Sequence, residues 1–252
     1  MRKFTLILLS IVMTSFLMAQ EPFGGSVTVG NYNSQATILY AQMNPVDTIP
    51  TTASQQFSDI NNSIAQTADD FIIPIGKTWN VSSVATIGAY WNGAGPANAF
   101  TVQFFADMGG LPAATPMFEQ TGLSYTETSG GMFDIPLNTS IQMNAGHYWI
   151  SIVAEMPFDP NGQWGSAWNN APQANYVFAD RDPDQLFNGA WPTTWGHSSD
   201  VTDWSNLNNY DLCFQINGGE TAAAVPVSNW AILFGVLLIG IFVVIRYRRS
   251  IA

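Results

Sequence analysis

The sequence predicts an all-β protein: an antiparallel β-sandwich or jelly-roll-like ectodomain followed by one C-terminal transmembrane helix. Apolar and polar residues alternate over several short runs of the middle of the chain, which is typical of half-buried strands. Clusters of Gly, Pro and Asn separate these runs, as expected of turns between antiparallel strands. No long stretch between the two ends shows the apolar stripe of a soluble helix.

The run at 146–155 illustrates the alternation, with Tyr148 and Ile150 on one face and His147 and Trp149 on the other. About eight to ten strands of this length fit a sandwich or a jelly roll. The other alternating runs are 81–91, 99–107 and 210–217, and the turn clusters are Asn92-Gly93, Gly109-Gly110, Gly130-Gly131 and Asn161-Gly162.

The charge distribution excludes a nucleic-acid partner. Between the two ends only Lys77 and Arg181 are basic, whereas all 18 carboxylates lie there. Binding to phosphates requires a basic surface that displaces counterions, and this chain has none. The other basic residues are Arg2, Lys3, Arg246, Arg248 and Arg249.

Residues 1–19 have the pattern of a signal peptide read by the secretion machinery. Arg2 and Lys3 precede an apolar run from Phe4 to Met18, and the small residue Ala19 then precedes a polar stretch. This run is short for a membrane span, so we expect cleavage after export rather than an uncleaved anchor.

A second apolar run, Trp230 to Ile245, predicts the transmembrane helix at 230–245. As a helix this run is about 24 Å long, somewhat short of the bilayer core, and residues from Val225 could complete it. The stop sequence Arg246, Arg248 and Arg249 follows at once, so the tail 246–252 is expected on the cytoplasmic side and the body outside.

The residues before this run resemble a bacterial sorting signal. A short motif with Val225, Pro226, Ser228 and Trp230, an apolar span and a basic cluster resemble the PEP-CTERM and IPTL-CTERM signals, which are read by membrane transpeptidases of the exosortase type. No second proline follows Pro226, and its spacing to Trp230 is shorter than in those families. An ordinary membrane anchor is the alternative.

The body, residues 20–217, resembles a β-sandwich module of secreted bacterial surface proteins to which no activity is assigned. The resemblance covers about 36–217 and implies fold and location only. Residues 218–229 then form a linker with the sorting motif, and Gly218-Gly219 is expected to end the last strand. The segments that carry the resemblance are Ile38-Leu39-Tyr40, Gln56-Phe57, 68–74, 102–112 and 147–151.

A repeated tryptophan pattern is the candidate ligand site. Asn161-Gly162-Gln163 leads to Trp164 and Trp168, and Asn188-Gly189-Ala190 leads to Trp191 and Trp195. Tryptophans four apart on a strand share a face about 13 Å apart, which suits stacking on successive sugars. A glycan platform that binds a surface polysaccharide, a protein interface and core packing remain open for these side chains.

Asp180, Asp182 and Asp184 alternate like the oxygen ligands of a calcium loop. Gln185 and Trp191 stand where an EF-hand requires Gly and Glu, so that motif is excluded. A structural calcium site of another geometry is the hypothesis, with a solvated turn as the alternative, and no other cofactor is expected. Asp69-Asp70 suggests a turn or cap at the start of a strand, with a calcium site as the alternative.

No catalytic motif is present. The only histidines are His147 and His197, and the sequence lacks Gly-x-Ser-x-Gly, His-Glu-x-x-His and a phosphate loop. The only cysteine, Cys213, is expected to fill space within a strand, with a reactive thiol as the alternative. We therefore expect a secreted, non-catalytic component of the cell envelope or extracellular matrix. A carbohydrate-binding module and a glycan-active hydrolase with two facing carboxylates are the alternatives.

Overall fold

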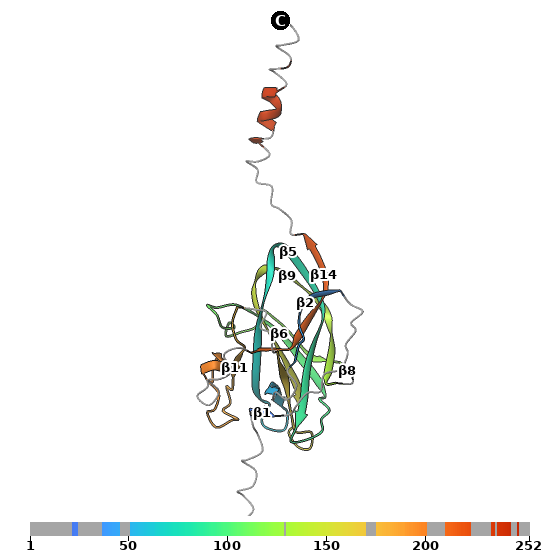
Figure 1. Ribbon diagram of the computed structural model, residues 1–252, viewed down its shortest axis with the longest axis vertical. Helices are drawn as coiled ribbons and strands as arrows, with labels where there is room; N and C mark the ends of the chain where they lie inside the picture. The colour runs from blue at the N-terminus through green and yellow to red at the C-terminus, as the bar shows by residue number, and fades with distance from the viewer. Residues whose placement is uncertain are drawn as a thin grey trace, which may run out of the picture. The chain divides into compact units, whose positions relative to one another are not determined.

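The computed structural model describes residues 22–24, 37–45, 51–128, 130–169, 175–200, 210–222, 233–234, 236–242 and 246. The chain divides into two compact units, Met1–Thr221 and Ala222–Ala252. Among the described residues of the first unit almost all the regular structure is β, as predicted, with one short 3-10 helix (Figure 1). In chain order the elements are β1 Phe23–Gly24, β2 Ile38–Gln42, β3 Thr51–Ala53, β4 Gln55–Phe57, β5 Ser63–Trp91, β6 Ala99–Ala106, β7 Phe118–Leu123, β8 Thr126–Thr128, β9 Met132–Met156, β10 Gln163–Asn169, β11 Ala179–Arg181, β12 Gly196–His197, η1 Ser198–Asp200, β13 Asp211–Leu212 and β14 Phe214–Ala222.

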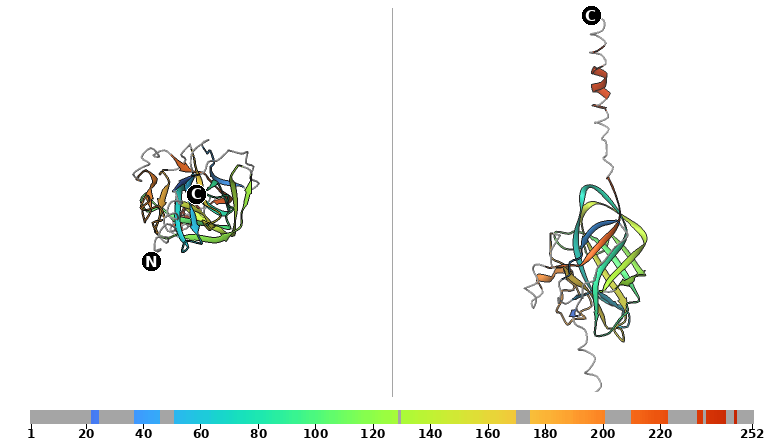
Figure 2. Two further views of the ribbon diagram at one scale, coloured as in Figure 1. Left: turned by 90° about the horizontal axis from the view of Figure 1, so that it is seen from below. Right: turned by 45° about the vertical axis from the view of Figure 1, so that its right-hand side comes forward.

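Two long strands, β5 and β9, form the frame of this unit. They pair antiparallel from Asp69↔Ile150 to Ile87↔Met132, with irregularities after Ile73 and after Val81. At these irregularities the two-stranded ribbon curves over one end of the unit, as the two views in Figures 1 and 2 show. We call residues 73–78 of β5 with 141–146 of β9 the arch.

The ribbon contributes to the sheet on both sides of the arch. On one side of the arch, the last part of β9 lies between the first part of β5 and β6, and β6 pairs in turn with β7. On the other side, the last part of β5 lies between the first part of β9 and β10, and β10 pairs with β3. One hydrogen-bonded path runs β1-β3-β10-β5-β4-β9-β6-β7, and the other strands pair with members of this path or with each other. The sheet is mixed because β4 runs parallel to β9. The prediction of a purely antiparallel sheet is therefore wrong at β4, and the jelly-roll connectivity stays a prediction.

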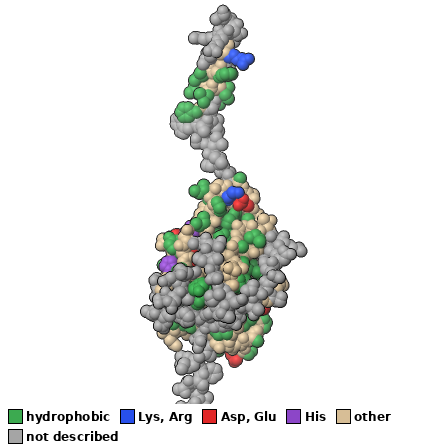
Figure 3. Space-filling model, in the orientation of Figure 1, with side chains coloured by type: hydrophobic (Ala, Val, Ile, Leu, Met, Phe, Trp, Pro, Cys, Tyr) green, Lys and Arg blue, Asp and Glu red, His purple; other side chains and the backbone are tan. Residues whose placement is uncertain are grey.

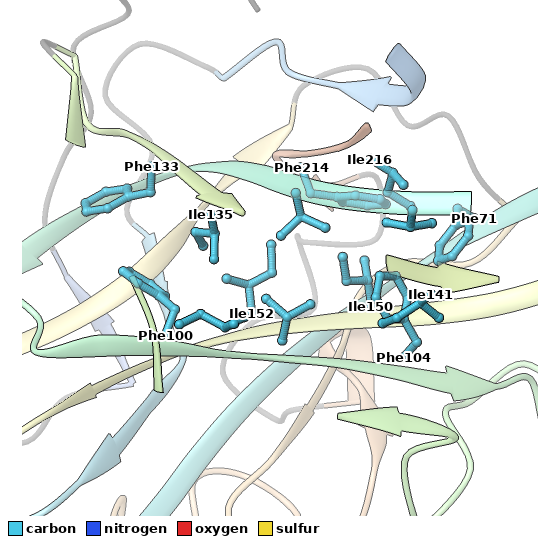
Figure 4. Close-up of a cluster of buried hydrophobic side chains, with 14 of the residues drawn as sticks. Phe71, Phe100, Phe104, Phe133, Ile135, Ile141, Ile150, Ile152, Phe214 and Ile216 are labelled. Atoms are coloured by element: carbon cyan, nitrogen blue, oxygen red, sulfur yellow. The ribbon is translucent and has the colours of Figure 1, made fainter. Parts of the chain in front are cut away.

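The main core lies between the two halves of this curved sheet. Alternation places Phe100, Val102 and Phe104 of β6 toward Ile150 and Ile152 of β9, and all five are buried. Figure 4 shows Phe104, Ile150 and Ile152 in one cluster with Phe71 and the β14 residues Phe214 and Ile216. Burial of this many large side chains is the main favourable free energy available to a body without disulfide bonds.

A second layer covers the outer face of the sheet. Residues 175–200, which we call the cover segment, include β11 and β12, and β11 pairs with β5. Beneath this segment, Phe105 and Trp149 pack against Trp195 and Ala179. The guanidinium of Arg181 lies 4.4 Å from the Trp195 ring centroid, so a cation–π contact also holds this layer.

The last strand does not end at Gly218-Gly219 as expected. Strand β14 continues to Ala222 and pairs with β2 and β5. A β-carbon at Gly218 would lie 2.1 Å from the carbonyl oxygen of Asn80. The glycine therefore permits two backbones to approach closely instead of ending the strand.

In the second unit, the helical residues that are described are 233–234, 236–242 and 246. Leu233, Phe234, Val236, Leu237 and Phe242 have exposed side chains. No helix within these described positions is long and apolar enough to cross a bilayer. The remaining residues of the predicted span at 230–245 lie outside the described part of the chain, so the span stays a prediction.

Candidate functional site

The candidate glycan platform is not at the surface. Trp164 and Trp168 lie on β10 and have exposed fractions of 0% and 3%. Trp164 packs edge-on against Phe100 and Phe133 in the main core, and the Trp168 indole N–H donates to the Thr52 hydroxyl. A glycan cannot stack on these rings because protein side chains already cover them.

The second copy of the pattern is also buried, and it is not on a strand. Trp191 and Trp195 have exposed fractions of 2% and 8%. Asn188 and Gly189 both have positive φ, so this Asn-Gly forms a tight turn, but turns and bends follow it instead of a strand. Sequence alone could not separate the two copies, because the first is held by pairing with β3 and β5 and the second is not.

The three aspartates of the calcium hypothesis do not form a metal site. Asp182 accepts the backbone N–H groups of Leu186 and Phe187, and Asp184 accepts that of Ile64. Asp180 is fully buried among the described residues. Across those same residues, no group of three or more His, Cys, Asp or Glu side chains could hold a metal ion.

The sorting motif cannot be placed. Val225, Pro226, Ser228 and Trp230 lie outside the described residues, as do Arg248 and Arg249 of the membrane stop. Arg246 is described as a helical, exposed residue.

The most distinctive polar site of the body was not predicted. It is centred on His147 and consists of Asp70, Asp107, His147, Trp149, Tyr176 and His197, which we call the His147 cluster. It contains both histidines of the chain, and it joins β5, β9, β12 and the loops after β6 and before β11.

An aspartate–histidine pair forms the base of this cluster. His147 Nε2 contacts Asp70 Oδ2, and its Nδ1 lies 3.9 Å from Asp107 Oδ2. Asp70 is fully buried, whereas the side chain of His147 is 21% exposed. Burial raises the pKa of Asp70, and the hydrogen bonds from His147 and from the backbone of Asn175 and Tyr176 oppose that rise.

Aromatic rings complete the cluster. The Tyr176 ring stacks on His147 at 5.6 Å between centroids and 6° between planes, and it also stacks on Trp149 and His197. The Trp149 indole N–H donates to Asp107 at 3.0 Å. The ring faces are therefore used within the protein, and the cluster fastens the beginning of the cover segment to the sheet.

A pair of buried carboxylates, Asp69 of β5 and Asp211 of β13, lies near the other face of β5. Consecutive strand residues face opposite sides, so Asp69 points inward while Asp70 points outward. Asp69 accepts hydrogen bonds from Gln42 and from the Leu212 backbone, and its pKa is raised well above the ordinary value by burial and by the nearby Asp211. Asp69 and Asp211 are 0% and 1% exposed, so neither can reach a polymeric substrate in this structure.

Cys213 lies near this inner pair, in the lining of a small pocket that it shares with Asp69 and Ser166. Burial, with the Asp69 charge as a smaller contribution, raises the pKa of the Cys213 thiol. The prediction of a buried cysteine is confirmed, but Cys213 lies between β13 and β14 and not within a strand.

One feature of the His147 cluster could be predicted from the sequence pattern. His147 and Trp149 share a strand face, as the alternation predicted, but Asp69-Asp70 lies inside β5 and not at a turn. Tyr176 and His197 could not have been found, because only the path of the cover segment across the sheet brings them beside His147.

The fold and the site define a β-sheet protein with a closed aromatic core. No protein-family model matches the chain, and no curated protein matches it. Among solved structures, it is similar to the cysteine protease and lectin-like domains of Cwp84, a surface layer associated protein of Clostridium difficile, with a TM-score of 0.41 and 11% identity. The match covers 63% of this chain and 32% of the other, so this chain spans about a third of that structure. Similarity of this degree assigns no function.

Proposed function

We propose that the protein is an exported, non-catalytic component of the cell surface or extracellular matrix. In this proposal residues 1–19 direct export, and the apolar segment 230–245 holds the chain in the membrane with the β-sheet body outside. A membrane transpeptidase of the exosortase type then processes the chain at the motif around Pro226.

The observation that carries the proposal is the apolar surface of the second unit. The side chains of Leu233, Val236, Leu238 and Ile239 are 58%, 63%, 65% and 66% exposed. A helix that exposes apolar side chains in all directions is stable only where an apolar medium covers it. The arginines that follow favour retention of that end on the cytoplasmic side.

The composition of the body supports a structural role. Charged residues make up only 10% of the chain, and the face drawn in Figure 3 shows correspondingly few charged side chains. The four tryptophans of the repeated pattern contribute to stability instead of presenting a glycan platform, which removes the observation that favoured a carbohydrate-binding module.

The test is the intact mass of the protein recovered from the native cell envelope. We expect a mass that lacks residues 1–19 and the segment after the motif, with an adduct at the new C-terminus. In a Pro226→Ala variant the apolar segment should be retained, whereas Ala224→Ser, a change in the same linker outside the motif, should leave processing intact. Recovery of the unprocessed chain from the cytoplasm would overturn export, and a wild-type chain that keeps its apolar segment would overturn transpeptidase processing but not anchoring.

A further inference from the structure

The arch exposes an isoleucine almost completely. Ile75 is 97% exposed, and it lies where β5 and β9 change register, just before Gly76 with its positive φ of 82°. Ile72, on the same strand, is 44% exposed. A single exposed apolar residue is common on protein surfaces. Ile75, however, lies where the two-stranded ribbon curves, and none of the described residues covers it.

The arch is also where the chain leaves the body. Glu220 near the end of β14 pairs with Lys77 and accepts the indole N–H of Trp79 at 3.3 Å. The Thr221 hydroxyl lies 3.5 Å from the carbonyl oxygen of Thr78. These contacts fix the end of β14 beside the arch, within the first unit.

The connection from this point to the apolar segment is short. From Ala222 to Trp230 a fully extended chain spans at most about 28 Å, at ~3.5 Å per residue. When the apolar segment is in a bilayer, the arch is therefore held within reach of that bilayer. Such a tether produces a high effective concentration, so a weak contact is sufficient.

The charge at the arch suits an uncharged interface. Although the chain has 18 carboxylates, residues 71–83 and 135–154 contain none. The nearby Glu220 is neutralised by Lys77, one of the two basic residues between the ends. The arch therefore presents an isoleucine and a neutralised ion pair to the bilayer surface. Anionic lipid would repel other parts of this acidic body.

We propose that the arch is a lipid-contacting surface. Ile75 inserts into the interfacial region of the membrane that holds the apolar segment, and the neighbouring Ile72 adds a second apolar contact, so the arch faces that membrane. This inference rests on the proposed anchoring and adds the orientation of the body. The same orientation would hold the motif around Pro226 at the membrane surface, where a membrane transpeptidase acts.

The test uses the full chain reconstituted into phosphatidylcholine vesicles, with Ile75→Cys labelled by a polarity-sensitive fluorophore. The native Cys213 is buried, so labelling is confined to the introduced thiol, and unlabelled wild type checks this. Ile72→Cys, at the residue of β5 just before the arch, is a second reporter. The control is Ser58→Cys, an exposed site in the turn after β4. Strand β4 pairs with the first residues of β5 and the last residues of β9, at the end of the ribbon away from the arch.

We expect the probes at positions 75 and 72 to shift to shorter emission wavelength on reconstitution and to lose fluorescence to lipid-attached quenchers. The probe at position 58 should do neither. If the chain does not float with the vesicles, the proposed anchoring fails. If it floats but the arch probes behave like the probe at 58, anchoring stands and the arch proposal is overturned.

Discussion

Replacing Asp180 by asparagine should stabilise the body at neutral pH, by an amount that depends on pH. Asp180 lies on β11 and is fully buried, and the side chain of Thr67 is the one nearby group that opposes the effect of this burial on its pKa. Burial raises the pKa of this carboxyl from 3.8 to about 8. The folded protein therefore holds Asp180 protonated at pH 7, whereas the unfolded chain releases the proton.

The magnitude follows from proton linkage. Because the folded-state pKa is the higher one, the contribution of Asp180 to stability is fully present below pH 4 and is lost as pH rises toward 8. Each pH unit in this window costs about 1.4 kcal/mol, so the loss reaches about 4 kcal/mol at pH 7. Asparagine is isosteric and does not titrate, so the variant lacks this loss.

The assay is urea denaturation of residues 20–222, wild type and Asp180→Asn, followed by tryptophan fluorescence between pH 4 and 9. The stability difference in favour of the variant should grow up to about pH 8 and then remain constant. Asp184→Asn, an exposed carboxylate of the same cover segment, controls for the loss of a negative charge. A difference for Asp180→Asn that does not change with pH would refute the reasoning.

Three further outcomes test the packing. Trp164→Ala should lower the free energy of unfolding by about 3–5 kcal/mol, because it opens a cavity in the main core. Calorimetry measures this loss, and an unchanged melting temperature would contradict the burial of Trp164. Gly165→Ala should be destabilising by about 1–3 kcal/mol or more, since the new β-carbon would lie 2.2 Å from the Thr52 carbonyl oxygen, whereas Gly219→Ala meets open space and should be close to neutral in the same experiment. The Cys213 thiol should resist alkylation in the folded protein and react on unfolding, because burial raises its pKa; rapid labelling of the native state would disprove this.

The alternation of apolar and polar residues predicted where strands occur better than it predicted where they begin and end. The alternation at 99–107 corresponds closely to β6, and those at 81–91 and 146–155 correspond to parts of β5 and β9. The alternation predicts β5 and β9 to be shorter than they are, because the residues that curve through the arch have no regular alternation. Their pairing across the arch keeps them in the sheet, and that pairing is between residues far apart in the sequence.

The tryptophan repeat shows the limit of pattern more sharply. The same Asn-Gly-x-Trp-x-x-x-Trp spacing gave a strand at Trp164 and irregular turns at Trp191. Spacing along a strand predicts which side chains share a face, but it does not predict whether another layer covers that face. The core interpretation, left open by the sequence, is the one that the burial of all four rings supports.

The sequence by itself determined the β class, the absence of a basic surface and the burial of Cys213, because each depends on composition or on residues close together in the chain. It also provides the whole basis for the predicted signal peptide and sorting motif. Only the tertiary structure decided that Asp70, His147 and Tyr176 meet, that the tryptophans are covered, and that Ile75 lies exposed at the arch. These features depend on which strands pair and which layer lies over them, and pairing is set by burial summed over the whole chain, which no local window contains.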